Sequence, residues 1–452
     1  MSDRGSSEHR AAWTAEIDAA VERAFTTRFE DLPAEVVAMA KWTILDAVGV
    51  AIVGSHEPVT QMLFDEFGGN GDASTLIGRP ERSSEFGAAF VNGVSAHSLD
   101  FDDWAPVSGA HVSTSLVPAA LAVAEQVDAT GEELITALVA AYELGEVIGE
   151  AVGKAHYALG FHPTGTVNVF ATAFVTARLM ELDREQTWMA LRVAATQAAG
   201  LKSMFGSMGK PLHGGRAAST GVLSARLASR GFVAGTDGIS GPLGFIDALG
   251  SPPAVTDRSD RPWQILDVKF KKHAACFGTY AVVDAMTGLR ADGWRPEDVT
   301  AVELTVSPGI QGVCSFEEPH SEMQTKFSPA WTGAIALSEG YVSLDTLPTW
   351  SDPETHRVAS SATVQFDASM IPLQASVRLT NARGEQAVRD ADVSGRDWTS
   401  SVDELADPLT SKFRAVAARG TTRGSADEIL GTVLDLENVK SARHLTELLG
   451  AV

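Results

Sequence analysis

Apolar residues between about positions 33 and 232 recur at the three- and four-residue spacing that places them on one face of an α-helix. In the first such run Leu45, Val48 and Ile52 share a face, and Gly54 follows as a stop signal. Many of the apolar positions are alanine, which has the highest helix propensity and allows helices to pack closely. Similar runs cover residues 113–127, 132–152, 167–180, 185–199 and 217–229. The pattern predicts a large all-α domain.

The period of the pattern changes after about Trp263. Apolar and polar residues now alternate as in a half-buried β-strand, at Val302–Val306, at Val364–Phe366 and at Ala375–Leu379. Residues 329–339 between them keep a helical pattern. This block predicts a smaller domain in which strands and helices are mixed.

The chain returns to a helical pattern between residues 407 and 449, where Lys412, Phe413, Val416 and Ala417 share one face. We expect this tail to pack against the first helices. The sequence therefore predicts a mainly α fold, with a large all-α helical domain plus a smaller α+β domain. We place the helical domain at residues 13–264 and 405–452, and the α+β domain at residues 265–404.

The composition is that of a folded protein, with 44% hydrophobic and 21% charged residues. Lys+Arg number 35 and Asp+Glu 58, so the net charge is −23, the opposite of the basic surface typical of a nucleic-acid binder. An anionic substrate is still compatible with this charge, because a site needs only a few local cations.

Cysteine usage and the apolar stretches bear on the compartment. The two cysteines, Cys276 and Cys314, exclude a disulfide framework and a cysteine-based zinc site, and they favour a reducing compartment. The N-terminus has no apolar signal-peptide core, and the apolar stretch Ile44–Val53 is interrupted by Asp46 and too short to span a bilayer. We therefore expect a cytoplasmic protein with no membrane association.

Four segments are too polar or too rich in glycine for a helix interior, and the first is residues 92–115. Three acids crowd four positions between His97 and His111: Asp100, Asp102 and Asp103. Like charges so close raise one another's pKa, which suits proton transfer or metal binding. The alternative is a helix end with capping aspartates before a loop. We predict no bound metal, although paired acids are ligands that Mg²⁺ accepts.

The second and third segments combine glycine with cationic or titratable side chains. The sequence GFHPTG places His162 at a helix junction, where it is either structural or catalytic. The sequence GSMGKPLHGGRAA spaces Lys210, His213 and Arg216 three residues apart, so that the first turns of a helix would present all three on one side. Such a cluster is a natural carboxylate or phosphate site, and the alternative is a solvated basic patch. The spacing is not that of a P-loop.

The fourth segment, VKFKKHAACFGTY, carries three lysines before Cys276: Lys269, Lys271 and Lys272. This pattern alone is weakly specific, because lysine-rich junctions are common on surfaces. No GxGxxG motif follows a strand and no GxSxG motif is present, so neither dinucleotide binding nor the simplest serine hydrolase is indicated. We expect no cofactor.

Taken in this order, the four segments resemble the 2-methylcitrate dehydratase (MmgE/PrpD) family, which includes cis-aconitate decarboxylase and iminodisuccinate epimerase. The segments AKWTILDAVGVAIVGS, KFSPAWTGAIALSEG and PLTSKF are similar to further signatures of that family. The resemblance covers nearly the whole chain from about Asp18. It implies a large all-α domain, a smaller α+β lid, a homodimer with its active site in the interdomain cleft, and cofactor-independent chemistry on small polycarboxylates.

The resemblance also implies site residues. The catalytic set would be Asp100, His111, His162, Lys210 and Lys271, with Lys269 or Lys272 in place of Lys271 if the register differs. The substrate-binding set would be Lys210, His213, Arg216, Lys271, Cys276 and Trp104. Two of these positions depart from the decarboxylase pattern, which has threonine at the place of Trp104 and histidine at the place of Cys276. His111 also lies one residue further from the acids than in that pattern.

We hypothesise that the cations of these segments hold substrate carboxylates while His162 moves a neighbouring proton, since an unperturbed imidazole titrates near neutral pH. His111 would be its partner, and Asp100 would orient or tune one of the two histidines. Loss of hydroxide would then give a dehydratase, loss of carbon dioxide a decarboxylase, and return of the proton an epimerase. We favour a lyase. The alternatives are an epimerase or isomerase of a related dicarboxylate, and a non-catalytic binding homologue.

Overall fold

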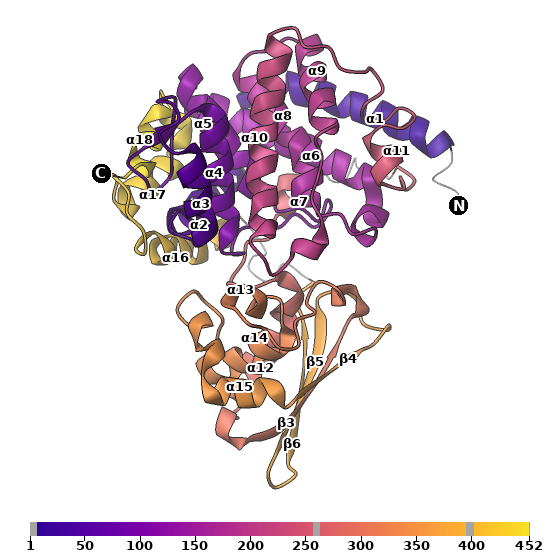
Figure 1. Ribbon diagram of the computed structural model, residues 1–452, viewed down its shortest axis with the longest axis vertical. Helices are drawn as coiled ribbons and strands as arrows, with labels where there is room; N and C mark the ends of the chain where they lie inside the picture. The colour runs from indigo at the N-terminus through magenta and orange to yellow at the C-terminus, as the bar shows by residue number, and fades with distance from the viewer. Residues whose placement is uncertain (1–6, 256–262, 395–401, 452) are drawn as a thin grey trace.

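Helices make up most of the computed structural model, which describes residues 7–255, 263–394 and 402–451 (Figure 1). A large helical part lies at one end of the longest axis, and a smaller part with a twisted sheet lies at the other. The predicted fold class, mainly α with a smaller α+β region, is confirmed. The helices of the large part are α1 (Ser7–Thr26), α2 (Ala34–Gly54), α3 (Pro58–Phe67), α4 (Glu85–Ser98), α5 (Ser113–Val127), α6 (Gly131–Ala158), α7 (Pro163–Thr166), α8 (Asn168–Leu179), α9 (Arg184–Ala195), α10 (Gly209–Ser229), α11 (Phe245–Leu249), α16 (Ala406–Ala417), α17 (Ala426–Leu434) and α18 (Arg443–Leu449).

Helices α4 and α10 pack closely against each other in the large part. A Cβ atom at Gly93 of α4 would lie 2.7 Å from the Cα atom of Gly215 in α10, so the two backbones touch where glycine faces glycine. His97 lies about one turn beyond Gly93, and Lys210 lies in the first turn of α10. The glycine contact therefore brings the histidine of one helix to the lysine of the other.

Most of the predicted helical runs agree with the observed ones. Helix α2 ends at Gly54, and α5 covers the predicted residues 113–127. Helix α10 begins at Gly209, eight residues before the apolar run at residues 217–229, and so includes the first turns predicted from the spacing of Lys210, His213 and Arg216. Helix α6 runs beyond the predicted residue 152 and is broken at Gly153, which has a positive φ of 68°.

The smaller part is a four-stranded sheet covered by helices on one face. The strand order is β4 (Ala362–Phe366), β3 (Val299–Val306), β5 (Gln374–Asn381) and β6 (Gln386–Asp392), with β3 and β4 parallel and the other pairs antiparallel. Helix α12 (Tyr280–Ala291) packs on β5 and β6, and α14 (Pro329–Glu339) and α15 (Pro353–Ser360) pack beside it. The short α13 (Glu322–Thr325) completes this part, and β1 (Ser74–Thr75) and β2 (Arg82–Ser83) form a ribbon in the large part.

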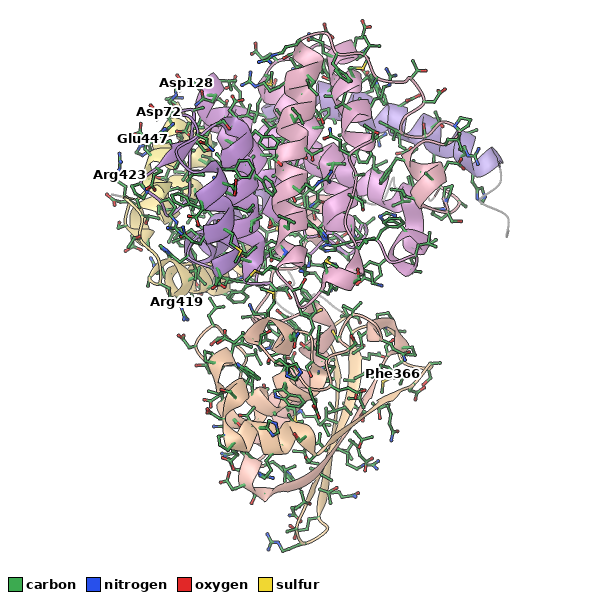
Figure 2. The ribbon with its side chains drawn as sticks, viewed as in Figure 1. Asp72, Asp128, Phe366, Arg419, Arg423 and Glu447 are labelled. Carbon is green, nitrogen blue, oxygen red and sulfur yellow. The ribbon has the colours of Figure 1, made fainter. Side chains whose placement is uncertain are left out.

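The three predicted strands and the predicted helix at residues 329–339 are confirmed, but β6 was missed. Its sequence, QAVRDAD, has no alternation of strongly apolar residues, because it is an edge strand whose side chains are mostly exposed. Phe366 at the end of β4 is likewise exposed at the rim of the sheet (Figure 2).

The C-terminal tail packs on the large part, as expected. Lys412, Phe413, Val416 and Ala417 of α16 are all buried, and α16 lies against α2. The argument that this region of α2 is too short to cross a membrane was wrong, because the helix has 21 residues and is long and apolar enough. However, 83% of its most apolar window is buried within the protein, as in the core helix of a globular fold.

Two hydrophobic cores underlie the two parts. The larger core gathers residues from Trp13 to Phe270 together with residues of the C-terminal helices, and the smaller one gathers residues from Ala275 to Val393. Domain limits at residues 13–264, 265–404 and 405–452 stay a prediction, since the larger core extends past residue 264 to Phe270 and a third, small cluster combines Val50 with Ala274.

The contact between α2 and α16 generates a testable prediction. A Cβ atom at Gly49 would lie 2.8 Å from Cδ2 of Phe413, so Gly49→Ala should lower the free energy of unfolding by about 1–3 kcal/mol through overpacking. Gly431→Ala is the matched control, because nothing lies within 4 Å of its added Cβ in α17. That variant should gain up to about 1 kcal/mol from helix propensity. Chemical denaturation measures both, and equal effects would contradict the packing argument.

Candidate active site

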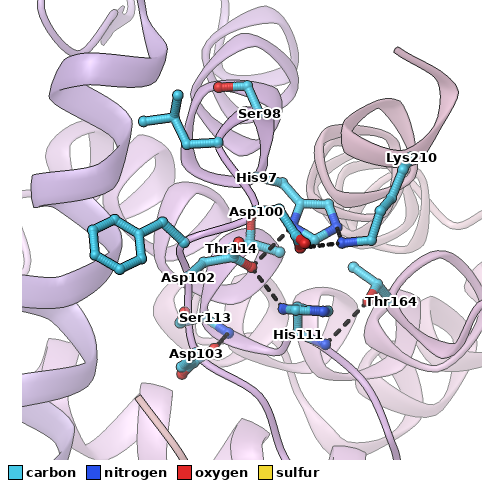
Figure 3. Close-up of polar contacts among 12 residues, drawn as sticks. His97, Ser98, Asp100, Asp102, Asp103, His111, Ser113, Thr114, Thr164 and Lys210 are labelled. Carbon is cyan, nitrogen blue, oxygen red and sulfur yellow. Dashed lines mark hydrogen bonds and ion pairs between the residues drawn. The ribbon is translucent and has the colours of Figure 1, made fainter. Parts of the chain in front are cut away.

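Asp100 lies at the centre of a buried cluster of charged side chains (Figure 3). Its Oδ1 atom accepts hydrogen bonds from Lys210 Nζ at 2.7 Å and from Lys271 Nζ at 2.8 Å. Burial alone would raise the pKa of Asp100, but the two ammonium groups outweigh burial and hold that pKa below its usual range. The same carboxylate raises the pKa of Lys271 against the opposing effect of burial. Asp100 and Lys271 are therefore both charged at neutral pH.

Asp102 faces two imidazole rings. His97 Nδ1 lies 2.9 Å and His111 Nδ1 lies 3.0 Å from its Oδ2 atom. A carboxylate only accepts hydrogen bonds, so the Nδ1 atom of His97 carries a proton. His97 Nε2 is then free to accept from Lys210 Nζ at 3.2 Å. Asp102 thus sets the tautomer of His97, while His111 Nδ1 lies close to the same oxygen without the geometry of a hydrogen bond.

His162 completes the group of histidines from a different segment. Its Nδ1 atom lies 2.9 Å from His213 Nδ1, and its ring stacks on that of His97 at a centroid distance of 5.9 Å. Burial, followed by the charge of Lys210, lowers the pKa of His162 well below its usual value. The expectation that His162 titrates near neutral pH was therefore wrong for the structure without substrate. The pKa of His111 is lowered for the same two reasons, burial and the charge of Lys210.

The other two histidines of the cluster, His97 and His213, are also neutral. Burial lowers the pKa of His97 to about 3 in spite of the opposing charge of Asp102. Burial and then Lys210 lower the pKa of His213 to about 4. The cluster thus holds its fixed positive charge on lysines and keeps its imidazoles as acceptors.

The three neighbouring acids differ in charge, contrary to the expectation that they raise one another's pKa. The pKa values of Asp100 and Asp102 are lowered, because lysines outweigh burial at the first and the two imidazoles outweigh it at the second. Only Asp103 behaves as expected: burial raises its pKa to about 8, although Ser113 N–H donates to it at 3.3 Å. Asp103 is therefore a neutral carboxylic acid at pH 7.

Three lysines hold the backbone of residues 99–101. Lys326 Nζ donates to the carbonyl of Leu99, Lys271 Nζ to that of Asp100, and Lys412 Nζ to that of Phe101, each at 2.7 Å. These carbonyls follow the last residue of α4, so the ammonium groups lie at the negative end of the helix dipole, which attracts cations.

Asp100 has a backbone conformation that favours glycine, with φ at +51°. The turn after α4 therefore carries a strained residue whose side chain is aimed at Lys210 and Lys271.

Aromatic rings surround Lys210 from both parts of the protein. Its Nζ atom lies 5.6 Å from the ring centroid of Phe205 and 5.8 Å from that of Phe327. Phe205 also contacts the ring of His162 edge-on at 4.8 Å. Phe327 belongs to the α+β part, so both parts enclose the same ammonium group.

The structure brings all five residues of the predicted catalytic set into or beside one cluster, and it separates the three lysines of the fourth segment. Lys269 Nζ donates to the carbonyl of Ser394, and Lys272 pairs with Asp284 at 2.6 Å, so Lys271 is the one whose Nζ reaches Asp100. The hypothesis that Asp100 orients one of the histidines was wrong. Asp102 contacts two histidines instead, since the carboxylate of Asp100 is occupied by lysines.

The other predicted substrate-binding residues lie at varying places around the cluster. Arg216 donates to the carbonyl of Gln197 at 2.7 Å, and His213 contacts His162. Trp104 is half-buried, with its ring 5.5 Å from that of Phe277. The backbone N–H of Cys276 donates to the carbonyl of Lys326 at 2.9 Å. Binding roles for these residues stay predictions.

Sequence reasoning left out His97, Asp102, Lys326 and Lys412 as site residues. His97 and Asp102 lie in the first polar segment, residues 92–115, but the spacing of the sequence does not predict which aspartate contacts which histidine. Lys326 and Lys412 lie in KFSPAWTGAIALSEG and PLTSKF, two segments that resemble family signatures, but nothing in those segments alone showed that their lysines reach the site.

His97, Asp102 and His111 could together hold a metal ion, since one ligand atom from each lies within 4.8 Å of the others. Two imidazoles and one carboxylate suit a transition metal better than Mg²⁺. Against this, the carboxylate of Asp102 already accepts a hydrogen bond from His97 and lies 3.0 Å from Nδ1 of His111. The absence of a bound metal stays a prediction.

Asp103 provides a test of the buried electrostatics. Its folded pKa of about 8 lies above the unfolded value, so the folded state binds more protons and loses stability as pH rises from about 4 to about 8. The slope for this group should approach about 1.4 kcal/mol per pH unit, and Asp103→Asn should remove it. Urea denaturation of both proteins at pH 5, 6 and 7 measures the difference. A difference that is independent of pH would mean that Asp103 is ionised in the fold.

Known proteins resemble this chain over nearly its whole length. The chain is 26% identical to human (Homo sapiens) cis-aconitate decarboxylase over 441 residues, which cover 92% of this chain and 90% of that protein. It is also 26% identical to a cis-aconitate decarboxylase of Aspergillus terreus over 93% of each chain. Residues 21–257 match the MmgE/PrpD N-terminal domain and residues 273–438 match the MmgE/PrpD C-terminal domain. Since these two domains span most of its length, the chain belongs to the MmgE/PrpD family.

Proposed function

We propose that this protein is a lyase that acts on a small di- or tricarboxylate, and that its reaction is the decarboxylation of cis-aconitate or of a close analogue. The observation that carries the proposal is the buried cluster of Asp100, Lys210 and Lys271 beside four neutral imidazoles. The curated relatives named above, which are decarboxylases, support the choice of this reaction among those of a lyase.

The lysines suit the binding of substrate carboxylates. Lys210 and Lys271 share one carboxylate, so the pair keeps one positive charge in excess, and Lys326 adds a third ammonium group nearby. In a buried site these charges would stabilise the negative charge that gathers on the substrate as a carbon–carbon or carbon–hydrogen bond breaks. The main contribution that we assign to the lysines is to stabilise this negative charge in a site from which water is excluded.

We assign proton transfer to His111 and His162. The carboxylate of Asp102 lies 3.0 Å from Nδ1 of His111, where it can orient the imidazole for catalysis. His162 lies across the cluster, with its ring centroid 6.3 Å from that of His111. An anionic substrate would raise the lowered pKa of both rings towards neutrality by its own charge, so that one ring can accept and the other return a proton.

Substrate entry requires the site to open, because Lys271 is 1% exposed and His162 is 1% exposed. We propose that the α+β part acts as the lid, since Lys326 and Phe327 leave the cluster if this part swings away. The exposed ion pair of Arg419 with Asp345 joins the same two parts at the surface (Figure 2) and breaks at little cost. A homodimer, a cytoplasmic location and independence of any cofactor stay predictions.

The proposal is tested with a panel of citrate-like, aconitate-like and amino-diacid compounds in deuterated water, with NMR detection and a carbon dioxide assay. We expect cis-aconitate to lose carbon dioxide and the product to carry one solvent deuteron. Loss or gain of water without carbon dioxide would indicate a dehydratase. Exchange of a proton without net product would indicate an epimerase, for which two bases on opposite sides are needed. Failure of every compound to react, with binding retained, would favour the non-catalytic homologue.

Variants of the cluster test the assigned roles on the compound that reacts. Lys271→Met should lower kcat/KM by at least about a hundredfold, because it removes a cation placed at the developing charge. Lys272→Met is the matched control: it removes the next lysine along the chain, which pairs with Asp284 away from Asp100, and should stay near wild-type activity. Equal losses in the two variants would contradict the assignment of Lys271.

The two histidines are compared in the same assay. His111→Gln and His162→Gln should each lower kcat by about a hundredfold or more with the fold intact. Near-normal turnover of either variant would remove that histidine from the proton-transfer step. Circular dichroism and thermal unfolding of each variant separate a lost proton-transfer group from a damaged fold.

A further inference from the structure

The two cysteines of the chain, 38 positions apart in sequence, meet in the α+β part. The Sγ atom of Cys314 lies beside the backbone two residues after Cys276, because a Cβ atom at Gly278 would be 2.8 Å from it. Each thiol also shifts the pKa of the other, as neighbouring groups do. Both cysteines belong to the packing of the same core.

The two thiols have different surroundings. Cys276 is partly exposed, whereas Cys314 is 6% exposed. The pKa of Cys276 is lowered, first by the neighbouring thiol of Cys314 and also by the charge of Lys271 and the N–H group of Gly278. The pKa of Cys314 is raised by the thiol of Cys276 and by burial. One partner is thus the more reactive thiol and the other a shielded thiol beside it.

We propose that Cys276 and Cys314 form a site of reversible oxidation by hydroperoxides, in which Cys276 reacts first and Cys314 resolves the product to a disulfide. The sulfur of Cys276 attacks one peroxide oxygen, the O–O bond breaks, and the products are a sulfenic acid on Cys276 and one water from hydrogen peroxide. The sulfur of Cys314 then attacks the sulfenic sulfur, the S–O bond breaks, and a second water leaves with the thiol proton. The two sulfurs lose two electrons in total, and the peroxide gains them.

The backbone around each cysteine is anchored, so the two thiols must meet with only a small movement. Cys276 begins a short 3₁₀ helix at Phe277–Thr279, and its N–H group is anchored on the carbonyl of Lys326. Cys314 N–H is anchored on the carbonyl of Ile310. The two thiols would approach by side-chain rotation, and the resulting cross-link would join two segments of the same part. The proposal concerns thiol chemistry and does not rest on the proposed function.

The test uses the full-length protein, reduced and then treated with hydrogen peroxide, followed by alkylation of free thiols and non-reducing peptide mapping. We expect one peptide pair linked between residues 276 and 314, two mass units lighter than the separate peptides, and its loss on treatment with dithiothreitol. Recovery of both cysteines in the alkylated form, or conversion of Cys276 to sulfinic acid with no linked pair, would overturn the proposal.

Two variants test the order of reaction. In Cys314→Ser, dimedone should label Cys276, since its sulfenic acid has no resolving partner. In Cys276→Ser, oxidation of Cys314 should be more than about tenfold slower than disulfide formation in the wild-type protein, because the remaining thiol is buried. Oxidation of Cys314 at the wild-type rate in Cys276→Ser would overturn the assignment of Cys276 as the reacting thiol. The wild-type peptide map decides the pairing even if a variant fails to fold.

Discussion

Three lysines donate hydrogen bonds to three successive carbonyls, those of Leu99, Asp100 and Phe101. The arrangement of the cluster depends on this constraint. Helix α4 ends just before these residues, and their buried carbonyls would otherwise be without partners. The ammonium groups satisfy them and complement the negative end of the helix dipole. Each lysine comes from a different region of the chain, so the turn forms only when all of these regions are in place.

The same constraint explains why an aspartate occupies a position that favours glycine. A positive φ costs of order 1 kcal/mol or more for a residue with a side chain, and glycine would avoid that cost. The carboxylate of Asp100, however, neutralises part of the charge of Lys210 and Lys271. Without it, two ammonium groups would be buried close together with no counter-charge, which costs several kcal/mol. The strain in the turn is smaller than the repulsion that it prevents.

Much of this fold was predictable from the sequence, because helical periodicity and strand alternation report burial directly. The end of α2 at Gly54 and the helix at residues 329–339 follow from local patterns. The edge strand β6 does not, since it depends on pairing with β5. For the site, the segments were identified but not their partners: Asp102 rather than Asp100 contacts the histidines, because the lysines that occupy Asp100 come from elsewhere.

The division of the cluster between the two parts gives the proposed chemistry a physical basis. The imidazoles, Asp102 and Lys210 belong to helices and loops of the large part, which keep their geometry through contacts such as Gly93 with Gly215. Lys326 and Phe327 come from the α+β part and complete the enclosure of Asp100 and Lys210. Closing the two parts would therefore remove water and bring the third ammonium group to the turn in a single movement. Electrostatic stabilisation is strongest where water is excluded, so the full positive potential would act only on a substrate that is already enclosed.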